Sequence, residues 1–185
     1  MPTPNWDKDR FDNLLRVWFD EVGPDHWYNS TPQIDAMLRK RFGETLEREG
    51  RRAAKDFLGD PETALAAAIL FDQIPRNIHR GTRLAYAWDD KAQVIGRGML
   101  LEGWTQRLEP TRAQFALMPL MHSEWLADQN ESVLRFGQLV PDALDYAQQH
   151  RKAIVRFGCF PHRNEVLGRE TTAAQQEAID AGLTW

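Results

Sequence analysis

Apolar residues recur along this 185-residue chain at spacings of three and four, which is the period of an α-helix. The first such segment places four apolar side chains on one side of a helix: Phe11, Leu14, Leu15 and Trp18. Alternation of apolar and polar residues, which would indicate β-strands, is nearly absent. The pattern therefore predicts an all-α fold of about seven helices, with no β-sheet of three or more strands.

Capping residues, prolines and glycines set the expected ends of these helices. Pro75 is expected to end the third helix, Pro119 to kink or break the fifth, and Gly158 to close the sixth. No linker and no repeat that matches a known consensus divides the chain, so we expect a single compact domain over residues 1–185. The predicted helices cover residues 7–21, 31–55, 60–74, 82–102, 110–125, 141–158 and a last stretch that begins at 171 or 172.

Composition and charge exclude several classes of protein. With 42% hydrophobic residues, seven Trp and nine Phe, the chain has the content of a packed globular protein. Its formal net charge of −4 argues against nucleic acid as a partner, because phosphate binding requires a basic excess. The longest apolar run, Ala64 to Phe71, is too short to span a membrane. Cys159 is the only cysteine, and no signal-peptide pattern opens the chain, so we expect a cytoplasmic protein.

Three polar residues lie within the apolar stripes of three different predicted helices: Asp72, His122 and His150. Burying a polar group is costly unless a partner compensates for it. Each residue taken alone could be an ordinary core residue, an Asp paired with an Arg or a His that donates to a carbonyl. Their presence on three helices favours a shared polar pocket.

Two short segments place an Arg beside an Asn after a proline. These are IPRN at residues 74–77 and FPHRN at residues 160–164. The forked donors of an Arg together with an amide suit a carboxylate or phosphate. If the inward helix faces meet in one core, Arg76 and Arg163 should lie side by side. The alternative is that both arginines bridge helix carbonyls and have a purely structural role.

No known cofactor or metal motif occurs in the chain. It contains no Walker A loop, no Rossmann glycine fingerprint, no HExxH and no paired CxxC. His122 and Glu124 are two residues apart and would point in different directions on a regular helix. We therefore expect neither a cofactor nor a metal site.

Five segments resemble a bacterial family of uncharacterised proteins, a domain of unknown function with a tetratricopeptide-like fold. They read VWFDEVGPDHWY, FDQIPRNIHRG, the following AYAWDDKA, LMPLMHSEWLADQ and FGCFPHRNEVLGRET, and the resemblance covers nearly the whole chain. It implies a right-handed superhelix of paired helices, but no activity. Cys159 stands where the family usually carries Arg. The family's characteristic positions correspond here to Asp72, Gln73, Pro75, Arg76, Asn77, Arg80, His122, Ser123, Glu124, His162, Arg163 and Asn164.

These observations lead to one interpretation and two alternatives. The first is a pocket that binds a small anionic molecule or an acidic peptide terminus, formed by Asp72, Gln73, Arg76, Asn77, Arg80, His150, Arg163 and Asn164. The second is an enzyme in the same pocket, with His122 or His162 as general acid or base and Glu124 orienting it. The third is an interaction scaffold that binds a peptide in a superhelical groove. The sequence specifies neither the ligand nor an oligomeric state.

Overall fold

Helices form all of the regular structure that the computed structural model describes, which is residues 8–182. The all-α prediction is confirmed, but the expected number of helices was too low. No helix in the described range is long and apolar enough to cross a membrane. Its ten α-helices are α1 (Lys8–Arg16), α2 (Pro24–Trp27), α3 (Pro32–Glu49), α4 (Pro61–Ile78), α5 (Asp89–Leu101), α6 (Pro110–Met121), α7 (Leu126–Leu139), α8 (Leu144–Phe157), α9 (Asn164–Leu167) and α10 (Ala173–Asp180).

The capping residues set several helix ends as expected. The Thr31 side chain accepts a hydrogen bond from the Ile34 N–H at the start of α3, and the Asp60 side chain caps α4 in the same way. Thr172 forms a capping box with Gln175 at the start of α10. Gly158 ends α8 in the left-handed conformation, with φ of 71°. The predicted first residue of the first helix, at position 7, lies outside the described residues.

Pro75 does not end α4, which continues for three more residues to Ile78. Side chains of the last turn donate hydrogen bonds to backbone carbonyl groups of the preceding turn. Arg76 donates to the Asp72 backbone oxygen at 2.6 Å, and Asn77 donates to the Gln73 backbone oxygen at 3.1 Å. The IPRN segment therefore forms the last turn of the helix, rather than a loop beyond its end. Pro119 also lies inside a continuous helix, α6.

The predicted helix over residues 82–102 is two elements. A 3₁₀ turn, η3 (Arg83–Tyr86), precedes α5, which begins at Asp89. Asp89 and Asp90 occupy the first turn of α5, where the helix dipole favours negative charge. This break matters for the site, because it places the Asp89 carboxylate at a helix end and close to α4.

Helix α7 was not predicted. Its buried residues are Asp128, Gln129, Ser132 and Phe136, so its inward face is mainly polar. Gln129 donates hydrogen bonds to the carbonyls of Met121 at 2.7 Å and Ser123 at 2.6 Å, and these bonds replace the apolar contacts that a periodic pattern would reveal. A search for stripes of apolar residues overlooks a helix whose buried face is mainly polar.

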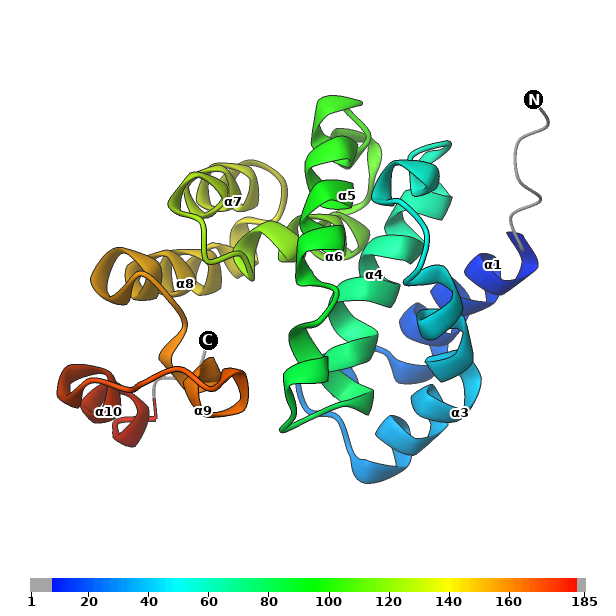
Figure 1. Ribbon diagram of the computed structural model, residues 1–185. Helices are drawn as coiled ribbons and strands as arrows, with labels where there is room; N and C mark the ends of the chain where they lie inside the picture. Colours follow the sequence, from blue (N-terminus) through cyan, green and yellow to red (C-terminus); the bar gives the residue numbers. More distant parts are fainter. Residues whose placement is uncertain (1–7, 183–185) are drawn as a thin grey trace.

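Helix α4 is the centre of the fold (Figure 1). Every residue from 63 to 75 is buried, and the helix packs against α1, α3, α5 and α6. A helix that is apolar on all sides is typical of a buried position, and its alanines allow close approach by the neighbouring helices. Beyond α6, the helices α7 and α8 and the C-terminal segment with α9 and α10 extend to one side. The end of α4 that carries Asp72 and Arg76 is thus brought near the end of α6 and the C-terminal segment.

The contact between α5 and α6 provides a test of this packing. A Cβ atom at Gly96 would lie 2.7 Å from the Leu120 side chain and 3.1 Å from the Ala116 carbonyl oxygen. We expect Gly96→Ala to lower the free energy of unfolding by about 1–3 kcal/mol in urea titrations followed by circular dichroism. Gly43→Ala in α3 is the control, since its nearest neighbour is 3.9 Å away, and it should stabilise by up to about 1 kcal/mol. Equal effects of the two changes would contradict the close packing.

Candidate functional site

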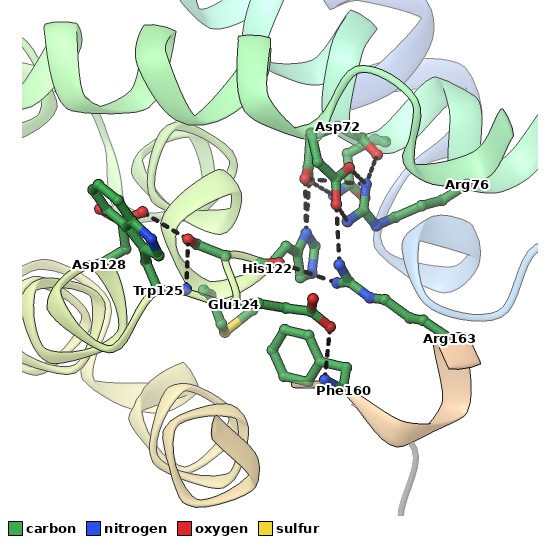
Figure 2. Close-up of polar contacts among 12 residues, drawn as sticks. Asp72, Arg76, His122, Glu124, Trp125, Asp128, Phe160 and Arg163 are labelled. Atoms are coloured by element: carbon green, nitrogen blue, oxygen red, sulfur yellow. Dashed lines mark hydrogen bonds and ion pairs between the residues drawn. The ribbon is translucent and has the colours of Figure 1, made fainter. Parts of the chain in front are cut away.

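Four charged side chains alternate in sign at the end of α4: Asp72, Asp89 and Arg163 are buried, and Arg76 is half-buried. Figure 2 shows Asp72, Arg76 and Arg163 in this cluster. Arg76 Nη1 lies 3.2 Å from Asp72 Oδ1 and 2.8 Å from Asp89 Oδ1, while Arg76 Nη2 lies 3.0 Å from Asp89 Oδ2. Arg163 Nη1 lies 3.1 Å from the same Asp89 Oδ2. Arg76 of IPRN and Arg163 of FPHRN therefore lie side by side as expected, with one carboxylate between them. Arg163 belongs to the 3₁₀ turn η6 (Pro161–Arg163).

His122 is joined to this cluster through Asp72. Its Nδ1 lies 2.8 Å and 2.9 Å from the two Asp72 carboxylate oxygens and donates a hydrogen bond to them. Burial acts to raise the pKa of Asp72, but Arg76 and His122 outweigh it and hold this pKa well below its usual range. Burial lowers the pKa of His122, although Asp72 acts in the opposite direction. Near neutral pH, Asp72 is therefore ionised and His122 is neutral, with Nε2 as the hydrogen-bond acceptor.

Arg163 is fixed by aromatic rings as well as by charge. Its guanidinium carbon lies 4.6 Å from the centre of the Tyr86 ring and 4.5 Å from that of Phe160. Nη2 donates to the His122 carbonyl oxygen at 3.1 Å. The Nε atom is buried and has no hydrogen-bond partner within residues 8–182. The guanidinium is thus held in one position with part of its donor capacity unused.

A cavity of about 770 Å³ opens beside the cluster. This volume is typical of a site for a small organic molecule. Its apolar lining includes Trp27, Met118, Met121, Phe136 and Val140. Its polar lining includes Gln73, Arg76, Asn77, Arg80, Tyr86, His122, His150, His162 and Arg163. The cavity therefore combines a polar end, rich in nitrogen donors, with an apolar body.

Two further histidines in the lining are neutral. His150 Nδ1 donates to the Tyr146 carbonyl oxygen at 2.8 Å, and its ring centre lies 5.8 Å from that of His122. Burial lowers the pKa of His150 to about 3, and burial lowers that of His162 to about 4, with Arg163 contributing to the second shift. Neither ring adds positive charge to the pocket near neutral pH.

Other polar residues of α4, and Arg80 just beyond its end, connect the cluster to the edge of the pocket. The Gln73 side chain donates to the Asp72 carboxylate. The Asn77 side-chain oxygen accepts a hydrogen bond from Arg80 at 3.3 Å. The Arg80 side chain is 60% exposed and pairs with Asp35 at 3.3 Å. Arg80 therefore lies at the edge of the pocket and is exposed to salt in the solvent.

Two residues expected in the site have other partners. The Glu124 carboxylate binds Arg169 at 2.7 Å and 3.0 Å and accepts the Phe160 N–H at 2.7 Å, so it holds the C-terminal segment and does not orient His122. Glu124 lies in the turn between α6 and α7, where the chain directs its side chain to the C-terminal segment. Asp72 has the orienting position instead.

Asn164 also lies outside the pocket lining, although it directly follows Arg163. Its side-chain nitrogen donates to Gln175 Oε1 at 3.2 Å and to Thr171 Oγ1 at 3.3 Å. Consecutive residues in a tight helical turn point in different directions, so the FPHRN segment sends Arg163 to the pocket and Asn164 to the C-terminal helix. Among the described residues, no group of three or more His, Cys, Asp and Glu side chains is placed to hold a metal ion.

Sequence reasoning missed two residues of the site, Asp89 and Tyr86. The acidic pair at positions 89 and 90 is a signal for a helix start, and it could have located the break before α5. Tyr86 and Asp89 both lie in AYAWDDKA, a segment that carries the family resemblance, but the resemblance gave neither residue a role. The role of Tyr86 comes from the position of η3 against the two arginines.

The sequence matches the model of a family described as "Bacterial protein of unknown function (DUF924)" over residues 14–182. The chain belongs to this family. A solved structure of a protein of unknown function from Agrobacterium tumefaciens, ATU0120, is similar to this member of the family, with a TM-score of 0.89 and 31% sequence identity. The match covers 95% of this chain and 99% of the other. None of the curated proteins compared with the chain matches it significantly.

The buried ion pairs of this family member should dominate the local stability. Asp72→Ala leaves Arg76 and Arg163 with the single carboxylate of Asp89, so one positive charge in the cluster is uncompensated, and we expect the free energy of unfolding to fall by about 3–5 kcal/mol in denaturant titrations. Glu131→Ala removes the partly exposed ion pair with Arg135 on α7 and is the control, with an expected loss below about 1 kcal/mol. If both variants lost a similar free energy of unfolding, the buried cluster would contribute no more to stability than an exposed ion pair does.

Because His150 and His162 are neutral in the folded protein, we expect the protein to lose stability in acid. Their folded-state pKa values are below the unfolded value of about 6.5, so the unfolded chain binds protons that the folded protein does not. The free energy of unfolding should therefore be constant above pH 7 and fall between pH 6.5 and about 4, by up to about 1.4 kcal/mol per pH unit for each histidine. His150→Gln should reduce the pH dependence of the free energy of unfolding by the contribution of one histidine, which is up to about 1.4 kcal/mol per pH unit. A stability profile that is flat across this range would refute the prediction.

Proposed function

We propose that this protein binds a small organic molecule with a carboxylate or another anionic group in the pocket beside Arg76 and Arg163. The observation that carries this proposal is a surplus of hydrogen-bond donors. Arg76 donates three hydrogen bonds to described residues and Arg163 donates two, fewer than the N–H groups that the two guanidinium groups carry. Buried donors normally have partners, so this end of the pocket suits a ligand rich in acceptors.

Hydrogen bonding, rather than net charge, should select the ligand. Asp72 and Asp89 offset the charges of Arg76 and Arg163, and the carboxylate between the two guanidinium groups removes most of their mutual repulsion. A carboxylate or phosphate would accept forked hydrogen bonds in a site of low dielectric constant, where such bonds are strong. The binding should therefore be less sensitive to salt than binding to exposed arginines.

The apolar walls favour a ligand with a hydrophobic body. Trp27 and Phe136 provide aromatic surface, and Met118 and Met121 provide flexible side chains that adapt to different shapes. A small acid with an aromatic or aliphatic group fits both ends of the cavity. An acidic peptide terminus presents the same head group, but the volume favours a small molecule over a peptide in a long groove.

The helix contacts support a tetratricopeptide-like arrangement. Each helix from α3 to α8 packs against the next, and α4 packs against α6 as α6 does against α8. Contacts between neighbours and between every second helix are typical of stacked helical pairs. In that arrangement the ligand pocket lies among α4, α6 and α8.

Binding of matched acids and amides tests the proposal. We expect a carboxylic acid such as phenylacetate to bind more tightly than its neutral amide, phenylacetamide, in isothermal titration calorimetry. Arg76→Lys and Arg163→Lys each keep a positive charge but remove the forked donors, and each should weaken acid binding by about tenfold or more. Arg97→Lys is the control, because Arg97 pairs with Asp128 outside the pocket lining. A panel of such pairs in which no acid is preferred over its amide would refute the proposal.

A further inference from the structure

His122 is placed to accept a proton inside the pocket. Its Nδ1 is held by Asp72, and the ring lines the cavity. In the described part of the chain, its Nε2 has no hydrogen-bond partner. A buried carboxylate that fixes the tautomer of a histidine also stabilises the imidazolium that forms when Nε2 takes a proton. This pair has the geometry of a general base with its orienting group.

The pocket offers no activated side-chain nucleophile among the described residues. Ser30 and Thr111 carry the aliphatic hydroxyls of the lining, and the Ser30 hydroxyl donates to Asp35 at 2.7 Å. Among the described residues, His122 Nδ1 is bonded to Asp72, and no hydrogen bond joins either hydroxyl to His122. Cys159 is outside the lining, and burial raises its pKa, so it remains a thiol near neutral pH. A reaction that uses His122 therefore requires a water molecule as the nucleophile.

We propose that the pocket hydrolyses a carboxylic ester, with His122 as the catalytic base and water as the nucleophile. The inference rests on the proposed function, because the acid released by hydrolysis is a ligand of the class that the arginines would bind. Arg76 and Arg163 line the same pocket as His122, and their N–H groups that lack partners among the described residues would donate to the ester carbonyl oxygen. Figure 2 shows Arg163 beside His122.

The reaction needs no oxidant or other reactant besides water. His122 Nε2 takes a proton from water as the water oxygen forms a bond to the carbonyl carbon. The π electrons of the carbonyl move to its oxygen, where the guanidinium N–H groups stabilise the negative charge. As the C=O bond forms again, the bond to the alkoxy group breaks, and this group takes the proton back from Nε2. One water and one ester give one acid and one alcohol.

Asp72 acts in this reaction as a positioning residue. It is 1% exposed and contacts Nδ1, so it does not touch the substrate. Its carboxylate keeps the proton on Nδ1 and the lone pair on Nε2, and it offsets the positive charge of the imidazolium. Its replacement by Asn should therefore change kcat and the pH profile and leave KM nearly unchanged.

Hydrolysis of p-nitrophenyl phenylacetate, followed by the release of p-nitrophenol, tests the proposal on the full chain. We expect His122→Gln to lower kcat/KM by about 100-fold or more. His79→Gln is the control, because burial also lowers the pKa of His79, yet this residue stacks on Trp88 outside the pocket lining. Circular dichroism and thermal melts of both variants check that each is folded. The wild-type rate should rise with pH to a plateau whose midpoint lies below about 6.5, because burial lowers the pKa of His122.

The outcomes separate this inference from the proposed function. Binding of phenylacetate that depends on Arg76, without ester hydrolysis above the buffer rate, would overturn the hydrolysis and leave the binding proposal in place. Hydrolysis that His122→Gln does not reduce would also overturn it. Loss of activity in His122→Gln with no preference for acids over amides would support the hydrolysis and refute the binding proposal. Asp72→Asn should shift the midpoint of the pH profile to lower pH, which a purely structural role would not do.

Discussion

The carboxylate of Asp89, shared by two arginines, determines how the rest of the site is arranged. Transferring a charge from water to a protein interior costs several kcal/mol, so each buried charge here requires a neighbour of opposite sign. Asp72, Arg76, Asp89 and Arg163 meet this requirement as an alternating series that joins α4, the start of α5 and η6. Three segments far apart in sequence thereby fix one another. The last member, Arg163, also donates a hydrogen bond to the backbone carbonyl of His122 and so links the series to the end of α6.

The sequence predicted those parts of the site that follow from helical period. Asp72 and His150 interrupt apolar stripes, and both are buried in the structure. The meeting of Arg76 and Arg163 was also expected, although IPRN proved to be the last turn of α4 and not a loop. Asp89 was missed because a single helix was predicted across residues 82–102, which places this residue within the helix. The partner that two buried arginines share depends on tertiary packing, and no local pattern encodes it.

The corrections at Glu124 and Asn164 have the same origin. Glu124 is two positions after His122, and Asn164 directly follows Arg163. Both side chains form their hydrogen bonds with the C-terminal segment instead of facing the pocket. Proximity in sequence groups residues in a motif, whereas the direction of the backbone decides which side chains meet. Helix α7 shows the complementary case, since its inward face is mainly polar and was not recognised as a buried face, although Gln129 anchors it to the end of α6.

The position of Arg163 has a consequence for how the protein is made. Helices α1 to α8 precede it in the chain, so Asp72, Arg76, Asp89 and His122 all leave the ribosome before the residue that joins Asp89 to the His122 carbonyl. Until then the growing chain carries two acids of the series, Asp72 and Asp89, with one arginine, Arg76, and the Tyr86 ring lacks the second of the two guanidinium groups that lie against it. The pocket is therefore completed last during synthesis, and a chain that stops before residue 160 lacks part of its wall even if the α4 core has formed.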